Sequence, residues 1–191
     1  GRREEYKDYG TNPCSEIILR NKQFCNLTEV VVREKDTQKT LEEKVTIATI
    51  LGTLQATLTN FRYLGSRWKQ NTAEESLLGV SMTGILDNPG MITGKINLEA
   101  LKEVAIKVNK EWAAKLGINQ SVAITCVKPS GTVSQLVDSA SGIHTRHSKF
   151  YLRTVRADKK DPLAKLMVDQ GVYHEDDVTK PDHTAIFSFP M

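Results

Sequence analysis

Two cysteines lie eleven residues apart within residues 10–32, and polar side chains flank the first of them. Asn12 stands two residues before Cys14, and Glu16 stands two residues after it. In an extended backbone, side chains two residues apart point to the same side, so the amide, thiol and carboxylate are expected to face one ligand. Such a set lets a thiol react while the carboxylate moves a proton and the amide positions a hydroxyl group.

The same residues also allow plainer interpretations. Cys14 could be a structural cysteine in a turn, because free cysteines are commonly small buried residues. A zinc site is disfavoured, since a sequence separation of eleven between the two thiols fits no common ligand spacing and the histidines lie far downstream. A cysteine–histidine nucleophile of the papain type stays open, although no neighbouring residue supports it.

A second candidate site follows a buried strand that we predict at residues 122–127. After Lys128 and Pro129 come small and hydroxyl-bearing residues: Ser130, Gly131, Thr132, Val133 and Ser134. Backbone N–H groups at a helix N-terminus are unpaired and partly positive, and a glycine lets an anion approach the backbone. The segment therefore predicts a phosphate site, with an ordinary N-capped turn as the alternative. It is not a P-loop, because the GxxxxGK[ST] spacing is missing.

The elements that must position these residues begin with two short strands, predicted at residues 17–19 and 24–32, with Cys25 inside the second. Apolar residues spaced three and four apart then predict a helix of about six turns that starts at Thr40. Thr40 and Glu43 form its capping box, and additional isoleucines indicate burial on more than one side.

Thr72 and Glu75 repeat the capping signature, and a connector with a short apolar core at residues 80–86 follows. A helix is predicted from an N-cap at Asn97 to a C-cap at Gly117.

The last predicted helix has Asp161 as its N-cap and Pro162 in its first position, and it ends before Gly171. A strand at residues 184–189 follows it. The mixed order of strands and helices favours the α/β class.

Composition narrows the function classes. The 191 residues are 39% hydrophobic and 26% charged, as in a globular protein, and the 6% of aromatic residues argues against a platform that stacks nucleic acid. The net charge of +3 is mild, although residues 144–160 form a basic stretch that suits a solvated face or a phosphorylated ligand. We predict neither a membrane span nor direct binding to nucleic acid. Three cysteines without a signal peptide favour free thiols in a reducing compartment, the cytoplasm.

The two motifs together resemble those of a known family. Residues 12–17 (NPCSEI), with residues 24–31 (FCNLTEVV), resemble the active-site finger loop of ribonucleotide reductase catalytic subunits. Residues 128–135 (KPSGTVSQ), which continue to residues 141–144 (SGIH), are similar to the substrate-phosphate segment of that family. Two motifs in the right order are more specific than either alone, and their form is most like the class II, adenosylcobalamin-dependent enzymes of the monomeric type.

This resemblance implies a ten-stranded α/β barrel. Residues 1–191 would be a single partial domain, the C-terminal part of the catalytic barrel, with the finger loop around residues 10–32. The implied activity is the radical-based reduction of ribonucleotides to deoxyribonucleotides, with adenosylcobalamin bound largely by parts outside this chain. The implied partners are a ribonucleoside di- or triphosphate, a dithiol reductant such as thioredoxin, and the remainder of the barrel.

The resemblance also implies roles for single residues. Cys14 becomes the transient thiyl radical that removes the ribose 3′-hydrogen, Glu16 takes the proton of the 3′-hydroxyl, and Asn12 binds the sugar hydroxyls. Cys25 is one of the two thiols that deliver reducing equivalents. The segment from Ser130 to Ser134 binds the substrate phosphates.

The chain departs from the family pattern at several points. Ser15 stands where glycine is more common, a change that we expect the loop to tolerate. The second reducing cysteine and the C-terminal cysteines of the family have no counterpart here, so the isolated chain is expected to be incomplete as an enzyme. Cys126 matches neither and is interpreted as a small buried residue. The alternative function is a non-redox nucleotide- or phosphate-binding α/β module with structural thiols.

Overall fold

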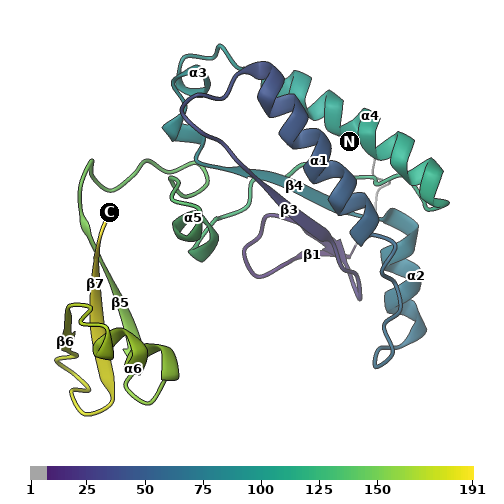
Figure 1. Ribbon diagram of the computed structural model, residues 1–191. Coiled ribbons are helices and arrows are strands. Elements are labelled where there is room, and N and C mark those ends of the chain that lie inside the picture. The colour runs from purple at the N-terminus through teal and green to yellow at the C-terminus, as the bar shows by residue number, and fades with distance from the viewer. Residues whose placement is uncertain (1–7) are drawn as a thin grey trace. The chain divides into compact units, whose positions relative to one another are not determined.

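The computed structural model describes residues 8–191, which form two compact units, one ending at Arg146 and one from His147 to Met191 (Figure 1). Each unit contains both helices and strands, which confirms the mixed α/β class. The expectation of a single partial domain stays a prediction. No helix among the described residues is long and apolar enough to cross a membrane.

Two parallel strands form the centre of the first unit. β3 (Asn26–Val31) pairs with β4 (Leu78–Thr83), and the register places Glu29 opposite Ser81. Because side chains alternate along a strand, Glu29 and Val30 face opposite sides of this sheet. Val30 is buried in the core beneath the helices, so Glu29 lies on the face away from them.

The segment predicted as a strand at residues 122–127 runs beside β4 but is less regular than expected. The N–H groups of Leu78 and Val80, two residues apart, donate to the adjacent carbonyls of Ala123 (3.0 Å) and Ile124 (2.8 Å). This mismatch interrupts the regular spacing of a parallel ladder, and the segment forms an isolated bridge rather than a strand.

The sequence predicts Cys25 inside the second strand, and this prediction is wrong. Cys25 lies immediately before β3. Pairing begins at Asn26, whose N–H donates to the carbonyl of Leu77 at 2.9 Å. The N–H of the preceding Phe24 instead donates to the hydroxyl of Thr72 at 3.1 Å. The strand therefore starts one residue after the cysteine.

Two long helices cover one face of the sheet. α1 (Gln38–Gln55) and α4 (Leu98–Leu116) pack against each other, and α1 packs on β3 and β4 (Figure 1). Their inward apolar residues form the core with the strands, as the spacing of three and four predicts. The buried residues of this core are Val30, Val32, Leu41, Val45, Ala48, Ala56, Leu78, Val80, Leu101, Ala105 and Ile124.

The predicted ends of α4 are confirmed. The side chain of Asn97 accepts a hydrogen bond from Ala100 N (3.0 Å), which satisfies one of the free N–H groups of the first turn. Gly117 ends the helix with φ of 67°, a left-handed conformation that glycine adopts without a steric penalty.

The predicted cap of α1 is wrong by one turn. Thr37 is the N-cap, and it forms a reciprocal capping box with Thr40, the residue that the sequence suggested as the cap. The carboxylate of Asp36 also accepts a hydrogen bond from the Thr40 hydroxyl (2.8 Å), which holds Thr40 inside the first turn. The helix ends at Gln55, so it is also shorter than predicted.

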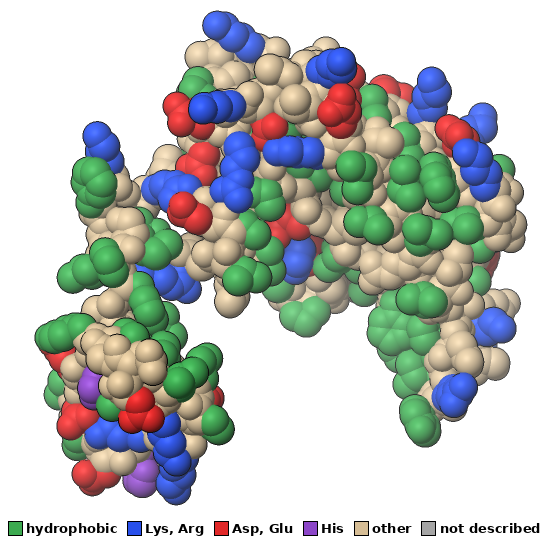
Figure 2. Space-filling model, in the orientation of Figure 1, with side chains coloured by type: hydrophobic (Ala, Val, Ile, Leu, Met, Phe, Trp, Pro, Cys, Tyr) green, Lys and Arg blue, Asp and Glu red, His purple; other side chains and the backbone are tan. Residues whose placement is uncertain are grey.

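The expectation that α1 is buried on more than one side is contradicted. Ile47 is 59% exposed, Leu51 56% and Leu58, just beyond the helix, 71%. Figure 2 shows hydrophobic side chains gathered on the surface over this helix. A two-stranded sheet and one neighbouring helix cover only part of the circumference of α1, so its outer apolar residues stay exposed among the described residues.

Thr72 and Glu75 were predicted to cap a helix, but they lie in the last turn of one, α2 (Ser66–Glu75). Both are buried, and the Glu75 carboxylate accepts a hydrogen bond from the side chain of Gln23 at 2.6 Å. The capping pattern was misleading here because its threonine and glutamate face the chain before β3 instead of the start of a helix.

The remaining elements of the first unit are short. β1 (Tyr9–Thr11) pairs antiparallel with β2 (Ile18–Arg20). Beyond β4 come η1 (Ile85–Asp87), α3 (Pro89–Ile92) and α5 (Thr132–Leu136).

The second unit is an antiparallel sheet with one helix. The strands lie in the order β5 (Leu152–Asp158), β7 (Thr184–Pro190), β6 (His174–Asp176). α6 (Pro162–Asp169) has the predicted cap, and the predicted last strand is β7, so both predictions are confirmed. Part of the basic stretch at residues 144–160 forms β5.

Candidate active site

The first candidate residues lie in a closed loop between β1 and β2, which we call the cysteine loop (residues 12–17). The N–H of Ile17 donates to the side-chain Oδ1 of Asn12 (3.0 Å), and the N–H of Asn12 donates to the Ile17 carbonyl (3.2 Å). A third bond joins Ser15 N to the Asn12 carbonyl (2.9 Å). The extended geometry expected from the sequence is therefore wrong: the loop is a turn closed by Asn12, and Cys14 is exposed on it.

Ser15 has φ of 61°, in the left-handed region. A side chain at such a position costs about 1–2 kcal/mol relative to glycine, because its Cβ crowds the following carbonyl. The loop thus accommodates the serine only with backbone strain.

Glu16 points from the cysteine loop into the protein, and its side chain is 1% exposed. Its Oε1 lies 3.4 Å from Nζ of Lys128, and its Oε2 has no hydrogen-bond partner among the described residues. Burial opposes ionisation, but interactions with the backbone at Glu16, with Asn12 and with the Lys128 ammonium outweigh it and lower the carboxyl pKa. The site therefore holds an ionised carboxylate, and one of its oxygens is unpaired within residues 8–191.

The second motif supplies the serine–glycine turn (residues 130–134). Ser130 is 3% exposed, and its hydroxyl donates to Oε2 of Glu29 at 3.2 Å. The hydroxyl of the fully buried Ser134 donates to the carbonyl of Gly131 at 2.7 Å. Both serine hydroxyls thus serve the protein itself.

The groups of the turn that stay available to an anion are different ones. Gly131 is the N-cap of α5, and no side chain among the described residues caps this helix, so the N–H groups of its first turn have no intrahelical partner. A Cβ added at Gly131 would meet no atom of the described part of the chain within 4 Å, so the glycine leaves open space beside these N–H groups. The Thr132 hydroxyl lies on the same first turn, and Val133 is half exposed.

Two polar contacts bring the two motifs together. Lys128 joins Glu16 of the cysteine loop, and Ser130 joins Glu29 on the face of the sheet away from the helices. Gly79 on β4 makes room there, because a Cβ at this position would stand 3.1 Å from both the Ile17 side chain and the Cys126 thiol. The loop and the turn, more than 100 residues apart in the chain, therefore lie on one face of the sheet.

The two other thiols are half-buried, and all three cysteines are free. Burial, followed by the negative charge of Glu16, raises the pKa of the Cys25 thiol. The same causes, with a contribution from Cys25, raise the pKa of Cys126 to about 11. Both groups are therefore protonated thiols at neutral pH. Cys25 also lines a cavity of about 560 Å³ together with Phe61 and Tyr63.

Sequence reasoning did not assign a role to Glu29 or Lys128. The signal for Glu29 was present, since alternation along residues 26–31 places it on the face opposite Val30. Lys128 carried no local signal, because its contact with Glu16 depends on the fold. Among the described residues, no group of three or more His, Cys, Asp or Glu side chains is arranged to hold a metal ion.

No protein-family model matches the chain. Among curated proteins, the adenosylcobalamin-dependent ribonucleoside-triphosphate reductase of Lactobacillus acidophilus is 30% identical over 95% of this chain and 28% of its own length. The reductase of the same description from Euglena gracilis is 29% identical over 98% of this chain and 26% of its own length.

A solved structure of a B12-dependent class II ribonucleotide reductase matches with a TM-score of 0.73 and 25% identity. The match covers 95% of this chain and 29% of that one, so the chain spans less than a third of the length of the proteins that it resembles. Over nearly its whole length, this chain is therefore a homologue of one segment of the adenosylcobalamin-dependent ribonucleoside-triphosphate reductases, which confirms the resemblance of its two motifs.

Proposed function

We propose that this chain carries the active site of an adenosylcobalamin-dependent ribonucleotide reductase and acts as part of a ten-stranded α/β barrel. The observation that carries the proposal is the convergence of the cysteine loop and the serine–glycine turn through the Lys128–Glu16 and Ser130–Glu29 contacts. A nucleotide bound on this face of the sheet has its sugar at the loop and its phosphates at the turn. The homology to reductases supports the reaction.

The cysteine loop performs the radical step. The Cys14 thiyl radical takes the 3′-hydrogen of the ribose, and Glu16 accepts the proton of the 3′-hydroxyl. The lowered pKa of Glu16 supports this role, because a base must be ionised before it accepts a proton. Asn12, whose Oδ1 closes the loop, positions the sugar hydroxyls.

Cys25 provides one reducing equivalent as the 2′-hydroxyl leaves as water. Its raised pKa supports this role, since the thiol keeps the hydrogen that it must deliver. A second thiol completes the reducing pair from the remainder of the barrel. A dithiol reductant such as thioredoxin then restores the pair in the cytoplasm.

The serine–glycine turn binds the phosphates of a ribonucleoside di- or triphosphate. The N–H groups at the start of α5 and the Thr132 hydroxyl donate to the phosphate oxygens, and the open space at Gly131 permits the approach. The Ser130 and Ser134 hydroxyls shape the turn, because both are already bonded within the protein.

Adenosylcobalamin, when bound, supplies the radical that Cys14 carries. The exposed position of Cys14 fits such a group, since a thiol that exchanges a radical with a large cofactor must be accessible from outside the loop. Most of the surface that holds the cofactor belongs to parts outside this chain.

The test is deoxynucleotide formation by the complete gene product with CTP, adenosylcobalamin and dithiothreitol. We expect product only with the cofactor, none with Cys14→Ser, and unreduced, base-releasing nucleotide with Cys25→Ser. Cys126→Ser is the matched control, because this thiol packs against Gly79 and has no assigned role, and it should keep activity. If the wild-type protein and its variants bind CTP tightly but none forms product, the proposal is contradicted and the non-redox binding module is favoured.

A further inference from the structure

The serine–glycine turn is poorly anchored by apolar packing. α5 has only five residues, and its two large apolar side chains, Val133 and Leu136, are 49% and 84% exposed. Helices in proteins are mostly stabilised by burying an apolar face, and this one buries little. Polar contacts at its ends must therefore fix its position.

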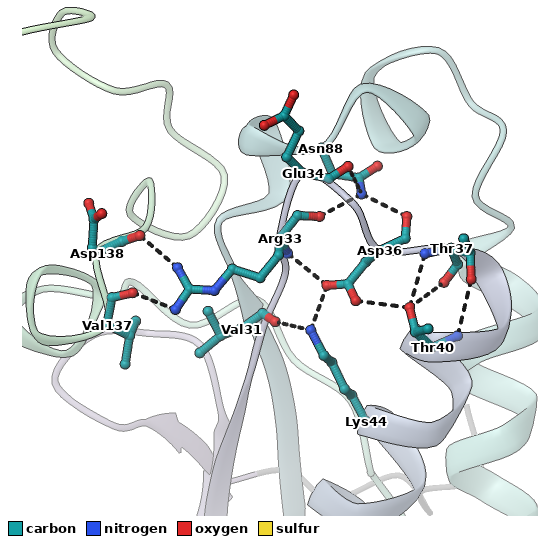
Figure 3. Close-up of polar contacts among 10 residues, drawn as sticks. All are labelled: Val31, Arg33, Glu34, Asp36, Thr37, Thr40, Lys44, Asn88, Val137 and Asp138. Carbon is teal, nitrogen blue, oxygen red and sulfur yellow. Dashed lines mark hydrogen bonds and ion pairs between the residues drawn. The ribbon is translucent and has the colours of Figure 1, made fainter.

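Two arginines that are far apart in the sequence, Arg33 and Arg146, both bind the residues at the end of α5. Arg33 follows β3, and its guanidinium donates to the carbonyls of Val137 (2.6 Å) and Asp138 (2.7 Å) (Figure 3). Arg146 donates to the carbonyl of Asp138 (3.0 Å) and to its carboxylate Oδ1 (2.8 Å). Cations are favourable at a helix C-terminus, where the last carbonyls have no intrahelical partner.

Arg33 is itself held rigidly by its neighbours, as Figure 3 shows. Its N–H donates to the Asp36 carboxylate at 2.7 Å, and its carbonyl accepts from the side chain of Asn88 at 2.8 Å. Asn88 is 1% exposed and also donates to the carbonyls of Glu34 (3.3 Å) and Asp36 (3.0 Å). The guanidinium therefore extends from a fixed loop.

Arg146 is anchored by Asp87 at the end of η1. Two bonds join the guanidinium to both carboxylate oxygens, at 3.0 and 3.1 Å, and Asp87 also accepts from Ala140 N at 2.8 Å. Burial opposes ionisation of Asp87, but these bonds outweigh it and lower the pKa of its carboxyl. Bidentate pairs of this kind fix orientation as well as distance.

Asp138 has φ of 46°, in the left-handed region that side chains rarely adopt. Aspartate tolerates this conformation better than most residues, and here three hydrogen bonds from the two guanidinium groups hold it. The bond from Ser139 N to the Ser134 carbonyl (2.9 Å) then connects this residue's neighbour directly to the serine–glycine turn.

We propose that Arg33 and Arg146 form a clamp on Asp138 that positions the serine–glycine turn for the substrate phosphates. The inference rests on the proposed function, and it adds two positioning residues that touch neither the substrate nor the reacting atoms. Removal of one guanidinium frees the end of a five-residue helix, so the N–H groups at its start lose their alignment.

The test compares Arg33→Ala, Arg33→Lys and Arg67→Ala in the complete gene product. Arg67 is exposed on α2 and outside the clamp, so its variant is the matched control. We expect Arg33→Ala to raise KM for CTP about tenfold, equivalent to ~1.4 kcal/mol, with kcat changed less than about twofold. Lysine keeps the charge but lacks the fork that spans two carbonyls, so it should restore only part of the loss.

Asp138→Asn is the second variant, because asparagine tolerates the left-handed conformation while losing the charge that pairs with Arg146. We expect a smaller rise in KM for Asp138→Asn than for Arg33→Ala. In both variants, amide hydrogen exchange within residues 131–139 should be faster than in the wild-type protein. Unchanged KM and unchanged exchange in Arg33→Ala would overturn the clamp. A tenfold loss of kcat with unchanged KM would also overturn the clamp, since the clamp acts on phosphate binding. If the wild-type protein forms no deoxynucleotide, the proposed function fails, and the exchange measurement still decides whether the clamp holds the turn.

Discussion

The hydroxyl of Ser130 donates a hydrogen bond to Oε2 of Glu29 at 3.2 Å, across 101 residues of chain. This bond connects the serine–glycine turn, which follows the irregular segment at residues 122–127, to β3. β3 is the strand that begins directly after Cys25. The other carboxylate oxygen of Glu29 is buried and has no partner among the described residues. The contact therefore couples the serine–glycine turn, our proposed phosphate site, to the sheet face that carries the cysteine loop.

This coupling predicts unequal effects for the two partners. Ser130→Ala leaves the Glu29 carboxylate without its donor, which should lower the free energy of unfolding by about 1–3 kcal/mol. Glu29→Gln keeps an acceptor for the hydroxyl and should cost less. Chemical denaturation of the three proteins checks this order, and a larger loss in Glu29→Gln than in Ser130→Ala would contradict it.

Removal of the Thr132 hydroxyl should affect phosphate binding, whereas removal of the Ser134 hydroxyl should affect stability. Thr132→Ala removes a donor at the open start of α5 and should weaken binding of inorganic triphosphate by about tenfold, as expected for one bond to a charged group. Ser134→Ala removes an internal bond at a fully buried position and should lower stability while leaving binding nearly unchanged. Calorimetric titration measures the first effect and thermal unfolding the second. The reverse pattern would show that the anion contacts Ser134.

Local periodicity and capping residues were enough to predict α4, α6 and β7. Asn97, Gly117 and Asp161 each act on the nearest turn of backbone, so their effect is readable without the fold. The start of α1 and the role of Thr72 could not be predicted in the same way, because hydrogen bonds to Asp36 and Phe24 compete with the local pattern.

In the candidate site, too, local features could be predicted from the sequence and contacts between distant residues could not. The residue types of the cysteine loop were evident from the sequence, but its closed shape depends on the side chain of Asn12 bonding to Ile17 N. The contacts of Lys128 and Ser130 span more than 100 residues and follow only from the packing of the chain.

Glu16 should titrate below the ordinary carboxyl value of 4.5. Because its folded-state pKa is lowered, it contributes stability above the unfolded pKa, and this contribution is lost as the pH falls through the folded value. Lys128→Met removes one cause of the shift and should move the titration of Glu16 upward. Carboxyl chemical shifts of labelled protein report both values. A titration unaffected by Lys128→Met would show that the ammonium does not act on this carboxylate.

Ser15→Gly should stabilise the cysteine loop. Glycine adopts φ of 61° without strain, so the substitution should raise the free energy of unfolding by up to about 1 kcal/mol, after its greater freedom in the unfolded chain is subtracted. Ser66→Gly, at the exposed first position of α2, is the matched control and should destabilise. Destabilisation by Ser15→Gly would mean that the weak 3.5 Å contact of its hydroxyl with Thr11 outweighs the strain.

The central claim is that the thiyl radical of Cys14 takes the 3′-hydrogen of a ribonucleotide bound on this face of the sheet, and so becomes a thiol. The most direct measurement is a competition between ordinary and 3′-deuterated CTP in the complete gene product, with the isotope ratio of the deoxynucleotide read by mass spectrometry. We predict that the product is depleted in molecules derived from the deuterated substrate, because breaking the carbon–deuterium bond is slower, and that Cys14→Ser gives no product. Deoxynucleotide formed without depletion, or formed by Cys14→Ser, would contradict the account.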